Sequence, residues 1–204
     1  MKKIAILLGT LVLLMITAML ACNSDPKPSS NKEGIAEITG PVNNDSLVSR
    51  GHYLVTIMGC NDCHSPKKMG PRGPEIDSLH LLSGHPAGMP TGKADPAVLK
   101  SWILFNQGLT AFVGPWGTSF AANITSDETG IGNWSEAQFF KAIREGKYKG
   151  MDNTRPLLPP MPWQMYAHAS DEDLRAIFAY LKSTPPVENR VPEIVPSSLL
   201  GKAN

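Results

Sequence analysis

The sequence predicts an all-α domain of short helices and long loops. Two observations support this prediction. Apolar residues gather where helices are expected, in the segments 47–58, 135–146 and 170–184. Gly and Pro together make up 36 of the 204 residues, which is above average usage but below the range typical of disorder. We therefore expect one folded body in which loops connect a few helices.

Capping residues predict where two of these helices begin and end. Ser135 and Gln138 form a capping box, and the helix that they start is expected to end near Gly146. Ser170 precedes three acidic residues and an apolar stripe at i, i+3, i+4 and i+7, and Pro185 ends that segment. The run 102–120 fits a helix or a strand, and this choice stays open.

The charge of the chain is nearly balanced. It carries 19 basic and 18 acidic residues, and without Lys2 and Lys3 of the first segment the balance is 17 against 18. A nucleic-acid partner is therefore not expected, because such partners need a strongly basic surface.

The N-terminus has the features of an export signal. Lys2 and Lys3 precede an apolar stretch over residues 4–20, which ends in Met19-Leu20-Ala21-Cys22. This box resembles the cleavage site of bacterial lipoproteins, in which the cysteine, here Cys22, is acylated. An uncleaved helix that crosses the membrane is the alternative. Both interpretations place the folded body outside the cytoplasm, anchored to a bacterial membrane.

These features divide the chain into four predicted parts. Residues 1–21 are a signal peptide of the lipoprotein type, and 22–45 form a flexible tether that is poor in large apolar side chains. Residues 46–190 form the folded domain, and 191–204 form a C-terminal tail.

Cys60, Cys63 and His64 form a Cys-x-x-Cys-His motif. Two thiols three residues apart on one helical turn face the same way and can add to the two vinyl groups of a haem. The next residue, His64, would then lie below the iron as its proximal ligand. The motif therefore predicts one covalently bound haem c, since no second such motif occurs in the chain.

Two other chemistries use a Cys-x-x-Cys pair. A zinc site needs two further Cys or His at ligand spacing, but the third cysteine, Cys22, lies in the export segment. A dithiol of the thioredoxin kind should lie in a βαβ pattern, which we do not find. Haem attachment is therefore the favoured interpretation.

Met161 is the candidate for the second axial ligand. It lies in Leu157-Leu158-Pro159-Pro160-Met161-Pro162-Trp163, where prolines restrict the backbone around a weak thioether ligand. Met165 is the nearest alternative and Met151 the next. Two histidine ligands are also possible, and His85 or His168 would then complete the pair, whereas His52 and His80 are less suitable.

The proximal imidazole needs an acceptor for its second ring nitrogen. Residues 70–74 contain two Gly-Pro pairs shortly after His64, and the carbonyl of Pro71 or Pro74 is a candidate. An ordinary turn is an equally good interpretation of this segment.

Together these features resemble the class I cytochromes c. The residues that carry the resemblance are the first helix ending in the haem motif, Gly51 facing Phe178 or Tyr180, the proline-flanked Met161 and the amphipathic last helix. More closely, the segments 123–135, 159–163 and 170–174 are similar to cytochrome c subunits that accept electrons from periplasmic dehydrogenases. The resemblance implies a class I cytochrome c fold over 46–190, with long loop insertions between His64 and Met161.

The resemblance also implies a role. Cys60 and Cys63 would be the covalent attachment points, with His64 and Met161 as axial ligands. The protein would be an electron carrier rather than an enzyme, exchanging single electrons with a periplasmic dehydrogenase, an oxidase or another cytochrome, and Lys67, Lys68 and Arg72 are candidate docking contacts. A haem enzyme or a haem-based sensor, each with an open or displaceable sixth position, is the alternative.

Overall fold

The computed structural model describes residues 44–200. The predicted signal peptide, Cys22 and nearly all of the predicted tether lie outside the described residues. The helices are α2 (Asn44–Ile57), α3 (Cys60–His64), α4 (Glu136–Glu145), α5 (Trp163–Tyr166) and α6 (Asp171–Ser183). Short 3₁₀ turns are η1 (Ser78–His80), η2 (Val98–Lys100), η3 (Tyr148–Gly150) and η4 (Ser197–Leu199). The three predicted longer helices are therefore confirmed.

The two longest helices, α2 and α6, cross at Gly51. A Cβ atom at Gly51 would lie 1.9 Å from the carbonyl oxygen of Ala176 and 2.6 Å from the Cβ atom of Tyr180. Only glycine allows the backbones to approach this closely. Of the two aromatic partners expected for Gly51, the structure selects Tyr180, while Phe178 stacks on Phe139 at a ring-centroid distance of 5.2 Å.

The hydrophobic core lies between α2, α4 and α6. Its largest fully buried members include Val55, Leu82, Ile131 and Leu174. Each such side chain contributes about 1.5–3 kcal/mol when it is removed from water. Leu82 and Ile131 come from loops, so the core also fixes segments outside the helices.

Helix α4 begins and ends where its capping residues predict. The Ser135 hydroxyl accepts from the backbone N–H of Gln138, whose side chain accepts from the N–H of Ser135. Gly146 follows the helix with φ of 63°, the left-handed conformation that glycine adopts without strain. In α6 the hydroxyl of Ser170 caps the N–H of Asp173 in the same way.

The prediction of an all-α fold is wrong, because the described part of the chain also contains two antiparallel sheets. Strands β1 (Lys67–Gly70) and β2 (Gly73–Ile76) form a hairpin. Strands β3 (Leu104–Phe105), β4 (Ala111–Gly114), β5 (Gly117–Phe120) and β6 (Val195–Pro196) form a four-stranded sheet in that order. The ambiguous run 102–120 is therefore largely strand, and residues of the predicted C-terminal tail supply β6.

The strands escaped prediction because each has at most four residues, too few for an alternating pattern to be recognised. The β1–β2 and β4–β5 hairpins share the turn Gly-Pro-Xaa-Gly, at residues 70–73 and 114–117. The last glycine of each turn has a positive φ, 115° at Gly73 and 107° at Gly117, which explains the choice of residue. This repeated turn is the sequence pattern that could have indicated the two hairpins.

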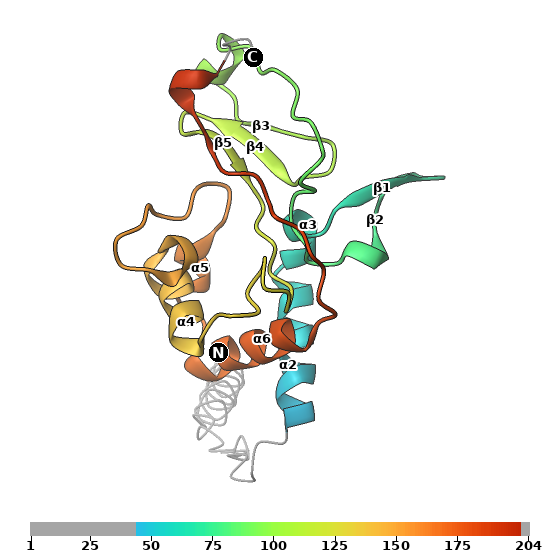
Figure 1. Ribbon diagram of the computed structural model, residues 1–204, viewed down its shortest axis with the longest axis vertical. Coiled ribbons are helices and arrows are strands. Elements are labelled where there is room, and N and C mark those ends of the chain that lie inside the picture. The colour runs from blue at the N-terminus through green and yellow to red at the C-terminus, as the bar shows by residue number, and fades with distance from the viewer. Residues whose placement is uncertain (1–43, 201–204) are drawn as a thin grey trace, which may run out of the picture. The chain divides into compact units, whose positions relative to one another are not determined.

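Figure 1 shows the arrangement within the described unit. The four-stranded sheet lies at one end, α2, α4 and α6 lie at the other, and α3 lies between them beside the projecting β1–β2 hairpin. Within residues 44–200 we find no helix of the length and apolarity that crossing a bilayer requires.

Candidate functional site

The Cys-x-x-Cys-His motif forms one complete helical turn, α3. A turn through Met58 and Gly59 separates it from α2, and Gly59 has a left-handed φ of 69°. The thiols of Cys60 and Cys63 are both free. Burial raises the pKa of Cys60 to about 11 and also raises that of Cys63, so both sulfurs are protonated at neutral pH. The sequence prediction that both thiols share one helical turn is confirmed.

His64 has a fixed tautomer. Its Nδ1 lies 2.7 Å from the carbonyl oxygen of Ala122. A carbonyl only accepts hydrogen bonds, so Nδ1 carries the proton and Nε2 keeps its lone pair. Burial lowers the pKa of His64, with the contact to Ala122 opposing this shift, so the ring is neutral near pH 7. A neutral imidazole with Nε2 available is the form that ligates iron.

The predicted acceptor for His64 is therefore wrong. Neither Pro71 nor Pro74 supplies it, because these residues belong to the β1–β2 hairpin, which projects away. The acceptor Ala122 is 58 residues distant in sequence and contributes only a backbone atom. No side-chain pattern could have indicated it.

Residues 82–85 hold Ala122 beside His64. They run antiparallel to residues 121–124 through two hydrogen bonds of 2.9 Å, from His85 N to Ala121 O and from Ile124 N to Leu82 O. The N–H of Gly84 also donates to the carbonyl of His64 at 2.7 Å. Gly84 has a φ of 79°, and a Cβ atom there would lie 2.5 Å from Ala121 O. Glycine is thus required for this three-way contact.

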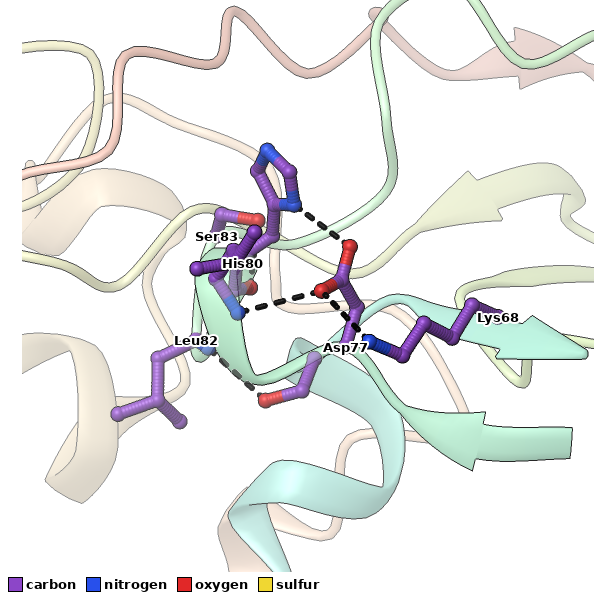
Figure 2. A network of polar contacts seen from close by, with 7 residues as sticks. Lys68, Asp77, His80, Leu82 and Ser83 are labelled. Carbon is purple, nitrogen blue, oxygen red and sulfur yellow. Dashed lines mark hydrogen bonds and ion pairs between the residues drawn. The ribbon is translucent and has the colours of Figure 1, made fainter. Parts of the chain in front are cut away.

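Figure 2 shows the polar cluster that shapes the turn before residues 82–85. Asp77 accepts from the N–H of Leu79 at 3.2 Å and from Nδ1 of His80 at 2.7 Å, and its carboxylate lies 3.9 Å from Nζ of Lys68. The hydrogen bonds from His80 and Leu79 lower the pKa of Asp77. The hydroxyl of Ser83 donates to the carbonyl of His80 at 2.8 Å.

Ser65 links this cluster to the motif. Its hydroxyl is completely buried, accepts from the N–H of Leu82 at 2.8 Å and donates to Oδ1 of Asn61 at 2.7 Å. Asn61 lies between the two cysteines, so the turn and α3 are bonded directly.

Lys67 caps the carboxyl end of α3. Its ammonium donates to the backbone carbonyls of Asp62, of Ser65 at 2.9 Å and of Asn61 at 3.5 Å. Burial lowers the pKa of Lys67, while the groups of Cys63 and Asp62 oppose that shift. Because its charge is used within the protein, Lys67 is a poorer docking contact than Lys68 and Arg72, which are exposed.

The loop that carries Met161 is held at both ends. The carbonyl of Pro159 accepts from Oγ of Ser119 at 2.9 Å, and the Pro159–Pro160 peptide is cis. After the loop, the hydroxyl of Tyr166 in α5 donates to the carbonyl of Met58 at 2.7 Å. Met161 itself is partly buried.

The environment of Tyr166 places α5 beside the haem motif. Burial raises the pKa of Tyr166, and the nearby groups of Cys60, Cys63 and Asp62 raise it further. The segment after Met161 and the segment that presents the two thiols are therefore neighbours, although they are about a hundred residues apart.

The alternative candidates for the second axial ligand lie in environments that differ from that of Met161. Met165 is 71% exposed and Met151 is 45% exposed. His85 is completely buried, with Nδ1 at 2.9 Å from Oγ1 of Thr110 and Nε2 at 3.3 Å from the carbonyl of Met89, so both ring nitrogens have partners. His168 is exposed. His85 is thus a hydrogen-bonded loop residue that is completely buried.

Asn123 fixes the segment that follows Ala122. Its side-chain amide donates to Oγ1 of Thr129 at 3.0 Å and to the carbonyl of Val187 at 2.8 Å, and its Oδ1 accepts from the N–H of Thr125 at 3.0 Å. The side chain is 5% exposed. The segment 123–135, which resembles cytochrome c subunits, thus begins with a residue bonded both to its own loop and to the segment at Val187.

Among the described residues, no group of three or more His, Cys, Asp or Glu side chains is arranged to hold a metal ion. The donor set present, two free thiols on one turn and a neutral imidazole, fits a haem attached by thioether bonds.

Comparison with known proteins identifies relatives, although no family model matches the chain. It is 36% identical to the gluconate 2-dehydrogenase cytochrome c subunit of Pantoea cypripedii over 67% of this chain and 23% of the relative. It is 30% identical to the cytochrome c subunit of the quinone alcohol dehydrogenase of Gluconobacter oxydans, over 74% of this chain and 24% of the relative. With the fructose dehydrogenase cytochrome subunit of Gluconobacter japonicus it shares 28% identity over 84% of this chain and 26% of the relative.

The chain spans about a quarter of the length of each of these relatives. The matches confirm the resemblance to cytochrome c subunits that the motifs predict. These three homologues are cytochrome subunits of dehydrogenases that act on gluconate, alcohol and fructose.

Proposed function

We propose that the protein is a monohaem cytochrome c that carries single electrons outside the cytoplasm. Cys60 and Cys63 would bind one haem c covalently, with His64 and Met161 as its axial ligands. The observation that carries the proposal is the tautomer of His64, whose Nδ1 is bonded to Ala122 O so that Nε2 is left for iron. When bound, the haem supplies an iron that takes up and releases one electron.

The chain's own residues would do three things at this site. The carbonyl of Ala122 orients His64 and holds the proton on Nδ1, while burial keeps the ring neutral. Lys67 holds the carboxyl end of α3, and Asn61 within the helix is bonded to Ser65 just after it. The prolines on both sides of Met161 limit the freedom of the loop and favour a closed sixth position. A methionine ligand favours the ferrous state relative to two nitrogen ligands, so we expect a comparatively high potential.

A dehydrogenase is the proposed electron donor, because the relatives are cytochrome c subunits of dehydrogenases. The β1–β2 hairpin is a suitable contact surface. It lies beside α3, and it carries the exposed side chains of Lys68, Met69 and Arg72. Such a small mixed surface suits a short-lived complex. An oxidase or another cytochrome would be the acceptor.

The protein is proposed to work on the periplasmic side of a bacterial membrane. Lys2, Lys3 and the apolar residues 4–20 support export, and Cys22 is the proposed site of lipid attachment. An uncleaved N-terminal helix would give the same location. Mass spectrometry of the mature N-terminus distinguishes the two anchors.

The ligand assignment is tested by the spectrum of ferric wild-type protein and of Met161→Ala. We expect the weak near-red band from sulfur-to-iron charge transfer in the wild type and its loss in the variant. Met165→Ala is the matched control and should keep the band, because Met165 is 71% exposed. An unchanged spectrum in Met161→Ala would refute the assignment.

The same preparation separates electron transfer from ligand chemistry. A carrier with a closed sixth position should bind cyanide slowly in the ferric state. Rapid binding by the wild type without denaturant would favour a haem enzyme or a haem-based sensor instead.

A further inference from the structure

Strand β5 and the two residues after it contact both segments that carry the proposed iron ligands. Oγ of Ser119 donates to the carbonyl of Pro159, two residues before Met161, at 2.9 Å. Three residues further along the chain, the carbonyl of Ala122 accepts from Nδ1 of His64 at 2.7 Å. One short stretch is thus bonded to the proximal and the distal side of the site.

The backbone of this stretch is firmly held. Ser119 pairs with Phe112 of β4, while Gly117 and Thr118 pair with Pro196 and Val195 of β6 on the other edge. Beyond β5, the N–H of Ala121 donates to the carbonyl of Thr110 at 2.9 Å. Strands on both sides therefore make β5 a rigid support.

The hydroxyl of Ser119 links this rigid strand to the loop that carries Met161. The residue is 6% exposed, and Nε1 of Trp116 donates to its oxygen at 3.2 Å. Because the indole N–H occupies the oxygen as an acceptor and the carbonyl of Pro159 can only accept, the hydroxyl proton is directed at Pro159.

The Met161 loop needs an external support of this kind. Prolines restrict the internal shape of the loop but do not fix its distance from α3. A thioether is a weak ligand, and its bond to iron depends on where the loop is held. Ser119 holds the loop before Met161, and Tyr166 holds it after Met161 through the carbonyl of Met58.

We propose that Ser119 is a positioning residue for Met161, and that β5 with its extension to Ala122 braces both axial ligands. This inference rests on the proposed function, because it requires Met161 to be the distal ligand. It assigns a role at the site to β5, one of the three strands of the four-stranded sheet that lie between His64 and Met161 in sequence.

The test is the rate at which cyanide displaces the methionine sulfur in ferric holoprotein. Cyanide enters when the sulfur has left, so the rate follows the fraction of protein with an open sixth position. Ser119→Ala should raise this rate about tenfold, since it removes one buried hydrogen bond. When the pH is raised, Ser119→Ala should also lose the near-red band at a lower pH than the wild type.

Ser126→Ala is the matched control. Oγ of Ser126 donates to the carbonyl of Thr184 at 2.6 Å, so this variant also deletes a hydroxyl bond to a distant carbonyl, but away from the Met161 loop. Its cyanide rate should equal that of the wild type. Trp116→Phe removes only the group that orients Ser119 and should raise the rate by a smaller factor.

The possible results separate this inference from the proposed function. If Ser119→Ala and Ser126→Ala react at the same rate while Met161→Ala loses the near-red band, the inference is wrong and the ligand assignment stands. If Ser119→Ala yields no holoprotein, an unchanged rate in Trp116→Phe overturns the inference. A wild type without the near-red band overturns both.

Discussion

His64 and His85 show how neighbouring atoms give the same side chain different tasks. Burial lowers the pKa of both. His64 bonds one ring nitrogen to a carbonyl and keeps the other available, whereas His85 has partners at both nitrogens. At the scale of single residues, hydrogen-bond partners therefore decide which histidine suits iron, and Ser119 and Ala122 matter although neither would itself bind the haem.

His85 predicts a pH dependence of stability. Nε2 of His85 donates to the carbonyl of Met89 at 3.3 Å, so in the neutral ring Nδ1 accepts from the hydroxyl of Thr110 at 2.9 Å. Burial lowers the pKa of His85, because the charged imidazole would lose its hydration there. Because the folded pKa lies below the ordinary value of 6.5, the stabilisation is complete above that pH and is lost as the pH falls through the window below it.

The free energy of unfolding of the holoprotein should therefore decrease below pH 6.5, as measured by denaturant titration. In His85→Gln this decrease should be smaller, whatever its stability at neutral pH. An equal decrease in both proteins would contradict the role given to His85.

At the scale of elements, the helix caps are formed by neighbouring residues, whereas some strand pairs and hydrogen bonds join segments far apart in sequence. The capping box at Ser135 and the cap at Ser170 are written in neighbouring residues, so α4 and α6 were predictable from the sequence. The strands were not predicted, because none is longer than four residues, and β5 also pairs with residues 195–196, which lie far away in the sequence. The acceptor Ala122 was missed for the same reason, since it depends on chain segments far apart in sequence.

Gly51 sets the distance between α2 and α6. Gly51→Ala would place its Cβ atom 1.9 Å from the carbonyl oxygen of Ala176, a backbone atom that cannot move without shifting α6. We expect a loss of about 3 kcal/mol in the free energy of unfolding, the upper range for overpacking. Thermal and denaturant unfolding of the holoprotein measure it.

Gly88→Ala is the control for this change, because nothing lies within 4 Å of a Cβ atom at Gly88. Its stability should differ from the wild type by less than about 0.5 kcal/mol. If the two variants lost the same stability, the crossing would not depend on the absent side chain at Gly51.

At the scale of the whole molecule, the helices and the four-stranded sheet hold different parts of the site. The helical core of α2, α4 and α6 presents α3, while the sheet supports the segments around His64 and Met161 from the other end of the described unit (Figure 1). The chain matches about a quarter of the length of its cytochrome c relatives, and one haem motif occurs in it.

The central claim is that one haem is bound covalently at Cys60 and Cys63, and the mass of the denatured protein tests it most directly. Protein from cells competent in cytochrome maturation should exceed the mass of its mature polypeptide and any lipid by one haem. Cys60→Ala and Cys63→Ala should each lose one of the two thioether bonds. A colourless wild type with the mass of polypeptide and lipid alone would contradict the account.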